Sequence, residues 1–343
     1  MTANTRAIGN SHQATGSSRL TTEIRAFLGK PGAGIFIFLV VLLILLGIST
    51  PQILKPGNLM GILNQMVFIL IPTLGITLVI IAGGLDLSVG SVIGLTGGIA
   101  AYLISHGVPL PMAFAAALLC GALLGLINGL VVTKLRIPDF IATLAMLGVV
   151  RGALYVWTQG VPIRNYMSPA YYYIGGLRMI GWRITIPLIV ALVLLLILAF
   201  ILRRTYYGTH LRATGSNPEA SKLFGVRPDQ IKVAAYVVSG ILAAITGVML
   251  AGRLTTVHPD MGRGYELRAI AAAVMGGAAL SGGRGSFYGA LVGALTLTVI
   301  QNAINVMNIE SSWEVVIVGA IILFAVLIDR AALALSGRKA PSH

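Results

Sequence analysis

Ten long apolar stretches constrain this chain more than any other feature. They lie at about 33–49, 59–82, 89–104, 111–133, 137–158, 184–202, 233–252, 267–281, 286–306 and 313–328. A helix needs roughly 20 apolar residues to cross a bilayer. Helices are the default spanning element because they pair their own backbone groups inside lipid, and these runs lack the alternation of barrel strands. The sequence therefore predicts an all-α, polytopic membrane protein with about ten transmembrane helices.

Composition supports this prediction and excludes several other classes of protein. Apolar residues make up 57% of the chain and charged residues 10%, whereas soluble domains have roughly 45–50% and about 25%. A soluble fold could not bury so much apolar surface. The single cysteine, Cys120, excludes a disulfide framework and a cysteine cluster for metal.

Glycine spacing predicts how these helices pack. The stretches 89–104 and 267–281 are short and glycine-rich, which leaves two interpretations: full spans, or broken or re-entrant segments buried in protein. A glycine at every fourth position lines one helix face and lets another helix approach closely. Three such stripes are present, at Gly90/Gly94/Gly98, Gly121/Gly125/Gly129 and Gly285/Gly289/Gly293.

The positive charge indicates an orientation in the membrane. The formal net charge is +14. With ten spans and a cytoplasmic N-terminus, 16 of the 24 basic residues fall on the cytoplasmic side and 7 on the other, while Arg151 falls inside a span. Because basic residues favour cytoplasmic loops, we expect both termini in the cytoplasm and no nucleic-acid partner. The predicted organisation is a cytoplasmic tail (1–32), a transmembrane domain (33–330) with a cytoplasmic loop (203–232), and a cytoplasmic C-terminal tail (331–343).

Motifs for catalysis are missing from the sequence. It contains no G-x-x-x-x-G-K-[ST], H-E-x-x-H or G-x-S-x-G. No acidic residue lies at the centre of a predicted span, where ion-coupled carriers often place one. We therefore expect no catalytic residue, no metal and no cofactor on this chain. A stand-alone secondary carrier and a membrane-embedded enzyme remain alternative interpretations.

The cytoplasmic loop 203–232 is too long for a simple turn and contains a helix signal. Ser216 or Asn217 can cap a helix, Pro218 suits its first turn, and Gly225 suits its end. The pattern predicts a short helix over 219–224. It is either an inert capped loop or a docking helix for a cytoplasmic partner.

Two further loops stand out. Glycines flank Asp86, which could cap the helix that follows. A second segment starts at Gly264-Tyr265-Glu266 and continues to Gly285. Their plain interpretation is a set of bends between short helices.

Four sequence runs together resemble the permease subunit of bacterial ribose-type ABC importers, a monosaccharide family. They are GGLDLSVGSVIGLTGG (83–98), FIATLAMLGVVRG (140–152), ATGSNPEASKLFGV (213–226) and GYELRAIAAAVMGGAALSGGRGSFYGALVGAL (264–295). The resemblance covers about residues 59 to 330. The positions that match family motifs are Gly83, Gly84, Asp86, Ser88, Gly90, Gly264, Tyr265, Glu266, Gly276, Gly277, Gly282, Gly283 and Gly285.

The resemblance implies import of a monosaccharide or related polyol across the bacterial inner membrane by alternating access. It implies a second permease subunit, a cytoplasmic ABC ATPase subunit that carries ATP and Mg, and a periplasmic sugar-binding protein. In the family, a cytoplasmic E-A-A-x-x-x-G segment docks on the ATPase. Here Ser221 stands in the third position and the usual Leu-Pro ending is absent, while Arg268 replaces an often acidic residue. The resemblance assigns docking to Asn217, Pro218, Glu219, Ala220, Ser221, Leu223, Phe224 and Gly225.

A path for a neutral polyol needs hydrogen-bonding groups and aromatic faces, not fixed charges. Eight residues within or near the spans are candidates, although such side chains also serve to bond neighbouring helices. They are Asn64, Gln65, Asn128, Tyr155, Trp157, Gln301, Asn302 and Asn305. The sequence leaves the sugar itself open, as well as the choice between a homodimeric and a heterodimeric permease.

Overall fold

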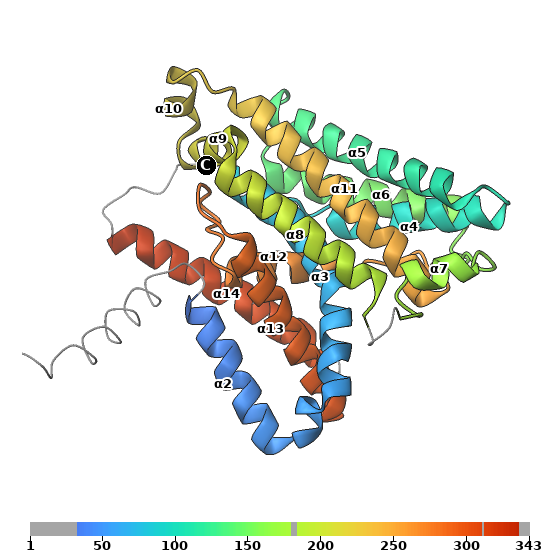
Figure 1. Ribbon diagram of the computed structural model, residues 1–343. Coiled ribbons are helices and arrows are strands. Elements are labelled where there is room, and N and C mark those ends of the chain that lie inside the picture. Colours follow the sequence, from blue (N-terminus) through green and yellow to red (C-terminus); the bar gives the residue numbers. More distant parts are fainter. Residues whose placement is uncertain (1–32, 180–183, 311, 336–343) are drawn as a thin grey trace, which may run out of the picture.

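The computed structural model describes residues 33–179, 184–310 and 312–335 (Figure 1). The predicted tail 1–32 lies outside these residues, and the predicted tail 331–343 is described only as far as Leu335. The helices are α2 (Ala33–Ser49), η1 (Pro51–Leu54), α3 (Pro56–Ile81), α4 (Val89–Ser105), α5 (Leu110–Thr133), α6 (Asp139–Thr158), α7 (Pro169–Ile174), α8 (Ile186–Arg204), α9 (Tyr206–Ser216), α10 (Pro218–Leu223), α11 (Pro228–Leu254), α12 (Tyr265–Met275), α13 (Phe287–Val306) and α14 (Ser312–Leu335).

The all-α prediction is confirmed. Each of the ten apolar stretches forms a helix, namely α2 to α6, α8 and α11 to α14. Among the described residues, six helices are long and apolar enough to cross a membrane: α3, α5, α6, α8, α11 and α13. α4 has 17 residues and α12 only 11, so helix length alone does not fix the number of spans.

Two long helices, α3 and α11, form the centre of the bundle (Figure 1). They run antiparallel, because Lys232 near the start of α11 donates a 3.0 Å hydrogen bond to the carbonyl of Gly83, just after α3. Farther along, a Cβ at Gly75 would lie 2.9 Å from the Cα of Ser239. The centre is therefore tightly packed, and α3 is buried along most of its length.

The remaining helices repeat one arrangement twice. α11 packs against α4 and α5, as α3 packs against α12 and α13. Likewise α4 contacts α5 and α6, as α12 contacts α13 and α14. Because α3 and α11 are antiparallel, the group α11–α14 is inverted relative to the group α3–α6. Such inverted repeats are common in membrane transporters.

The stripe on α5 confirms the predicted glycine packing. A Cβ at Gly121 would lie 2.7 Å from the Cβ of Ala244, and one at Gly129 would lie 2.9 Å from the Cα of Val233. Both neighbours belong to α11. Glycine is therefore required for the close approach of α5 and α11.

Two irregular segments interrupt the bundle. Residues 82–88 separate α3 from α4, and residues 255–264 separate α11 from α12. Gly90, at the start of α4, lies against two residues of the second half: Gly262, in the irregular segment, and Glu266, in the first turn of α12. The stretch 89–104 is thus an unbroken short helix, whereas the helix in the stretch 267–281 ends at Met275 and is followed by turns, so that stretch is broken, in line with the second interpretation. Irregular backbone precedes each of the two short helices.

The bundle has two ends, which we call the α10 face and the opposite face. The α10 face carries α9, α10 and the loops joined by the Lys134–Asp229 ion pair (3.7 Å). On the opposite face, the loop after α6 pairs with the segment after α11 through a bridge between Ile163 and Val257.

Candidate functional site

α10 forms as its capping residues predict. Asn217 accepts a 2.9 Å hydrogen bond from the backbone N–H of Ala220, so Asn217 is the cap that satisfies a free donor of the first turn. Pro218 occupies the first helical position. Gly225 has φ of +80°, the left-handed conformation that favours glycine after a helix. The helix runs Pro218–Leu223, one residue earlier at each end than predicted.

Apolar side chains project from α10. Leu223 and Phe224 are each 87% exposed. Glu219 is also exposed and accepts a 2.8 Å hydrogen bond from Lys222, which lowers the pKa of the Glu219 carboxyl. Two large exposed apolar side chains beside a fixed charge are typical of a surface that contacts another protein.

Ser221 accounts for one departure from the family motif. Its side chain is buried, and its hydroxyl donates a 2.8 Å hydrogen bond to the carbonyl of Asn217. The third motif position therefore points inward, where a small residue is needed. A serine satisfies that requirement as well as an alanine does.

A cavity of about 490 Å³ lies beside α10 on the same face. Its charged side chains are balanced between three basic and three acidic residues. Its lining is Gly83, Val132, Thr133, Arg136, Ile137, Pro138, Asp139, Pro218, Glu219, Lys222, Pro228, Asp229 and Lys232. Within the described part of the chain, no group of three or more His, Cys, Asp or Glu residues could hold a metal ion.

Asp86 anchors the first irregular segment. Its carboxylate accepts hydrogen bonds from the Ser88 N–H (3.0 Å), the Ser88 hydroxyl (2.6 Å) and the Ser239 hydroxyl (2.9 Å). The prediction that Asp86 caps α4 is wrong, because Ser88 is the residue that precedes the helix. Asp86 instead forms a turn with the N–H two residues onward.

Asp86 also corrects an expectation about acidic residues. It is 2% exposed and bonds Ser239, which lies about 16 Å along α11 at 1.5 Å per residue. An acid thus lies deep in the bundle although none lies at the centre of a predicted span. The reason is that the irregular segment 82–88 folds back between the helices.

Most of the eight path candidates tie helices together. Thr185 donates to Asn64 (2.8 Å), Gln65 to Gln301 (3.2 Å), and Asn128 to the Ser88 hydroxyl (2.8 Å). Asn302 exchanges two hydrogen bonds with Asn58 (2.8 and 3.0 Å). The three candidates with exposed side chains are Tyr155, Trp157 and Asn305. Contact of any of the eight with substrate stays a prediction.

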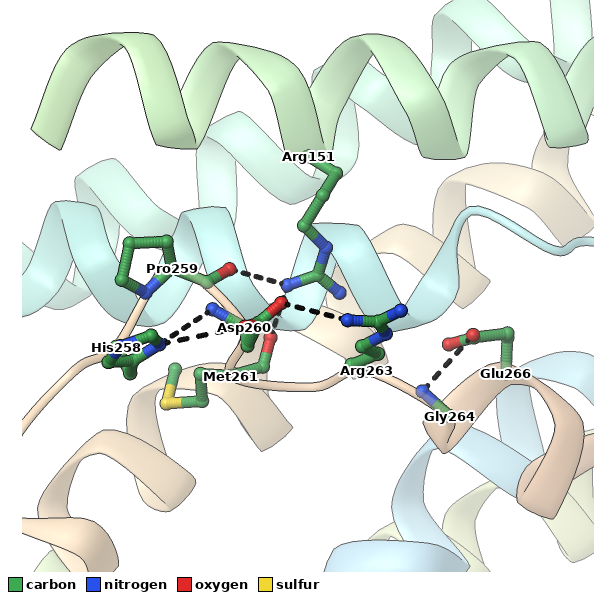
Figure 2. A network of polar contacts seen from close by, with 8 residues as sticks. All are labelled: Arg151, His258, Pro259, Asp260, Met261, Arg263, Gly264 and Glu266. Atoms are coloured by element: carbon green, nitrogen blue, oxygen red, sulfur yellow. Dashed lines mark hydrogen bonds and ion pairs between the residues drawn. The ribbon is translucent and has the colours of Figure 1, made fainter. Parts of the chain in front are cut away.

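The second irregular segment carries a polar network (Figure 2). Nη1 of Arg151, on α6, donates to the carbonyls of Pro259 (2.8 Å) and Met261 (2.7 Å). Asp260 lies 3.6 Å from Arg263 and 3.9 Å from His258. Arg151 was identified from the sequence as a basic residue inside a span, whereas the segment 258–263 was not predicted to be part of a site. The signal was present, because the run His258-Pro259-Asp260-Met261-Gly262-Arg263 is polar and directly follows an apolar span.

Glu266 closes this network at the start of α12. Its Oε1 accepts a 3.1 Å hydrogen bond from the Gly264 N–H. Its Oε2 is buried without a hydrogen-bond partner among the described residues and lies against Gly90. The motif residues Gly90, Gly264 and Glu266 therefore meet where the two short helices begin.

An inverted pair of helical groups, with two short helices beginning inside the bundle, defines a membrane transport protein. The family described as "Branched-chain amino acid transport system / permease component" matches residues 58–326. The chain belongs to this family, and within it to the monosaccharide ABC importer permeases.

Three relatives illustrate the similarity. The ribose import permease protein RbsC of Escherichia coli K12 is 37% identical over 295 residues, 85% of this chain and 92% of that protein. RbsC of Bacillus subtilis is 38% identical over 304 residues, 87% and 92% of the two chains. The L-arabinose ABC transporter permease protein AraH of Azospirillum brasilense is 33% identical over 300 residues, 87% of each. No solved structure matches this chain.

Proposed function

We propose that this chain is the permease subunit of an ABC importer that moves a monosaccharide or related polyol across the bacterial inner membrane. The observation that carries the proposal is α10, a capped helix that exposes Leu223 and Phe224 within an E-A-S-x-x-x-G segment. The names of the relatives, which import ribose and L-arabinose, support the substrate class.

In this proposal α10 docks on a separate cytoplasmic ATPase subunit, so that the α10 face is cytoplasmic, as are both termini. Basic residues concentrated on that face support this orientation. Burial of Leu223 and Phe224 in the ATPase would contribute about 1.5–3 kcal/mol for each side chain. ATP and Mg would bind the ATPase subunit.

A packed route leads from α10 into the bundle. α10 follows α9, whose Gly215 lies against Ile81 and Gly283. The Gly283 N–H donates a 2.9 Å hydrogen bond to the carbonyl of Ile81, at the end of α3. A displacement of α10 by ATP would therefore reach the end of α3 and the loop after α12, which is the coupling that alternating access requires.

Two further partners complete the importer. A second permease subunit would pair with this chain, and a periplasmic sugar-binding protein would deliver the sugar to the opposite face. The first substrates to test are D-ribose and L-arabinose.

Uptake into proteoliposomes tests the proposal. The permease is reconstituted with the ATPase and the binding protein encoded beside it, and uptake of radiolabelled D-ribose and L-arabinose is measured with ATP on the α10 side. We expect uptake of at least one sugar only when ATP and ATPase are both present. Uptake without the ATPase would overturn the proposal in favour of a stand-alone carrier.

A charge reversal tests the docking helix separately. Glu219→Lys places like charge beside Lys222 at the proposed interface, so we expect weaker assembly with the ATPase and lower sugar-stimulated ATP hydrolysis. Glu310→Lys is the matched control, since Glu310 is exposed on the opposite face. Equal assembly and hydrolysis for the two variants would contradict the docking assignment.

A further inference from the structure

Polar and charged side chains are exposed within the membrane-spanning bundle. In the segment between α11 and α12, the side chain of Arg263 is 79% exposed, that of His258 56% and that of Asp260 41%. Asp260 and Arg263 form a weak ion pair of 3.6 Å, and the backbone N–H of Asp260 donates a 3.3 Å hydrogen bond to Nδ1 of His258. These contacts leave much of each side chain free to contact solvent or another molecule.

This segment starts at the opposite face, at Val257, and its later residues Met261 to Arg263 lie deep in the bundle. Gly262 contacts Gly90, at the first turn of α4, and α4 continues to Ser105 at the opposite face. At 1.5 Å per residue, Gly262 is ~22 Å from that end of α4, against about 30 Å for a hydrocarbon core. Arg263, the next residue, is therefore far below the membrane surface.

Lipid cannot be the neighbour of these side chains. Ionisable residues inside a membrane face a bundle interior or a water-filled cavity, because exposure to hydrocarbon is strongly unfavourable. The backbone of this segment also cannot face lipid, because irregular segments at membrane depth are tolerated only where they are buried in protein or line a water-filled cavity. The exposed side of residues 258–263 therefore borders water or protein.

The chemistry of this surface suits a neutral polyol. Fixed charges were not expected in such a path, but the formal charges around this surface balance, with Arg151 and Arg263 against Asp260 and Glu266. Arg263 offers donors and Asp260 offers acceptors for hydroxyl groups. Tyr155, a partly exposed aromatic side chain of α6, lies close to Asp260.

Arg151 fixes the geometry of the segment. Its two hydrogen bonds hold the carbonyls of Pro259 and Met261 against α6, on either side of Asp260 (Figure 2). Gly94 of α4 makes room for this contact, since a Cβ there would lie 2.6 Å from the Met261 carbonyl oxygen. The exposed side chains are thus presented by a backbone anchored to two helices.

We infer that the polar surface formed by His258, Asp260, Arg263 and Tyr155 lines the aqueous translocation path of this permease. The inference rests on the proposed function and specifies which side of the chain the sugar passes. It places the path along the segment before α12, away from the buried candidates Asn64 and Asn128, which bond other helices.

Cysteine accessibility in the complete complex tests this inference. In a Cys120→Ser background, Arg263→Cys and Tyr155→Cys are compared with Leu123→Cys, whose side chain is exposed on an apolar face of α5. The probe is a membrane-impermeant quaternary-ammonium methanethiosulfonate. We expect residues 263 and 155 to react roughly 100-fold faster than residue 123, because a cationic reagent is excluded from hydrocarbon.

A second measurement distinguishes the path from a static cavity. Alternating access exchanges the side from which water reaches the path, so labelling at residue 263 should change several-fold between the resting complex and the complex trapped with ATP and vanadate. Rates at 263 and 155 as slow as at 123, or equal rates at 263 in both states of a complex that hydrolyses ATP, would overturn the inference. Neither result would affect ATP-driven uptake, which tests the proposed function.

Discussion

Asp86 and Ser239 are joined by a 2.9 Å hydrogen bond that ties the irregular segment before α4 to the middle of α11. The bond joins the two halves of the inverted arrangement, since α4 belongs to one group and α11 to the other. Asp86 is 2% exposed and accepts two more hydrogen bonds from Ser88. The segment 82–88 is held by several such bonds, since Leu85 donates to Asp139 of α6 (2.6 Å) and Lys232 and Tyr236 of α11 donate to Gly83 and Leu85 (both 3.0 Å). Asp86 is the buried carboxylate at its centre.

Removal of this carboxylate should destabilise the bundle. Asp86→Ala leaves the buried hydroxyls of Ser88 and Ser239 without their acceptor, and each unsatisfied group costs about 1–3 kcal/mol. We expect a clearly lower midpoint of thermal unfolding in detergent. Asp229→Ala is the control, since its ion pair with Lys134 is exposed and contributes about 0–1 kcal/mol. Equal midpoints for the two variants would show that the Asp86 network is not structural.

The glycine stripe on α5 makes a second prediction. Gly121→Val should force α5 away from α11, because even a Cβ at this position would lie 2.7 Å from Ala244. Overpacking of this kind costs typically 1–3 kcal/mol. Gly148→Ala, on α6, meets nothing within 4 Å and should leave the unfolding midpoint unchanged or raise it slightly. Tolerance of valine at residue 121 would argue against the close approach of these helices.

Two tyrosines with buried hydroxyls, the half-buried Tyr207 and the fully buried Tyr171, form a matched pair. Burial raises the pKa of Tyr207 to about 12, so its hydroxyl is neutral at physiological pH, and it has no hydrogen-bond partner among the described residues. Tyr207→Phe should therefore keep or raise stability. Tyr171 donates a 2.8 Å hydrogen bond to the Val248 carbonyl, so Tyr171→Phe should lose about 0.5–1.5 kcal/mol. Thermal unfolding of both variants should give a higher midpoint for Tyr207→Phe than for Tyr171→Phe. A higher midpoint for Tyr171→Phe would contradict this prediction.

Arg268 and Glu314 form an ion pair of 2.9 Å between α12 and α14. Their side chains are 25% and 13% exposed, and Gln301 donates a 3.2 Å hydrogen bond to the second carboxylate oxygen. Removal of one member of a buried pair leaves an unpaired charge and costs up to about 3–5 kcal/mol. Glu314→Ala should therefore destabilise the protein more than the double variant Arg268→Met/Glu314→Leu.

A double-mutant cycle of unfolding free energies measures this coupling. Additive effects of the two single substitutions would show that Arg268 and Glu314 do not interact. Strong coupling would explain the departure of residue 268 from the often acidic family residue, because the basic side chain has its own acidic partner here.

The positions of the helices were predictable from local sequence, whereas the paths of the irregular segments through the bundle were not. The ten apolar stretches and the cap at Asn217 depend on nearest neighbours along the chain. The positions of Asp86 and Asp260 depend on how residues 82–88 and 255–264 return into the bundle. That return is determined by contacts with α6 and α11, which no local pattern contains.

Of the candidate sites, the docking helix was predictable from local sequence and the exposed polar segment was not. The spacing of Glu219 and Gly225 was enough to predict α10, because a short capped helix is a local structure. The path candidates were selected as polar residues within spans, and most of them bond other helices. The exposed polar residues lie instead in a segment that resembles a loop when judged by sequence alone.

ATP-driven sugar uptake by a Leu223→Ala/Phe224→Ala variant tests the central claim most directly. Both side chains are 87% exposed in this chain, so the variant should fold with an unchanged unfolding midpoint. Loss of their burial against the ATPase should weaken docking by at least about tenfold, the equivalent of ~1.4 kcal/mol. The account predicts an intact permease with greatly reduced uptake and ATP hydrolysis no longer stimulated by the sugar-loaded binding protein. Wild-type uptake and stimulation by this variant would contradict it.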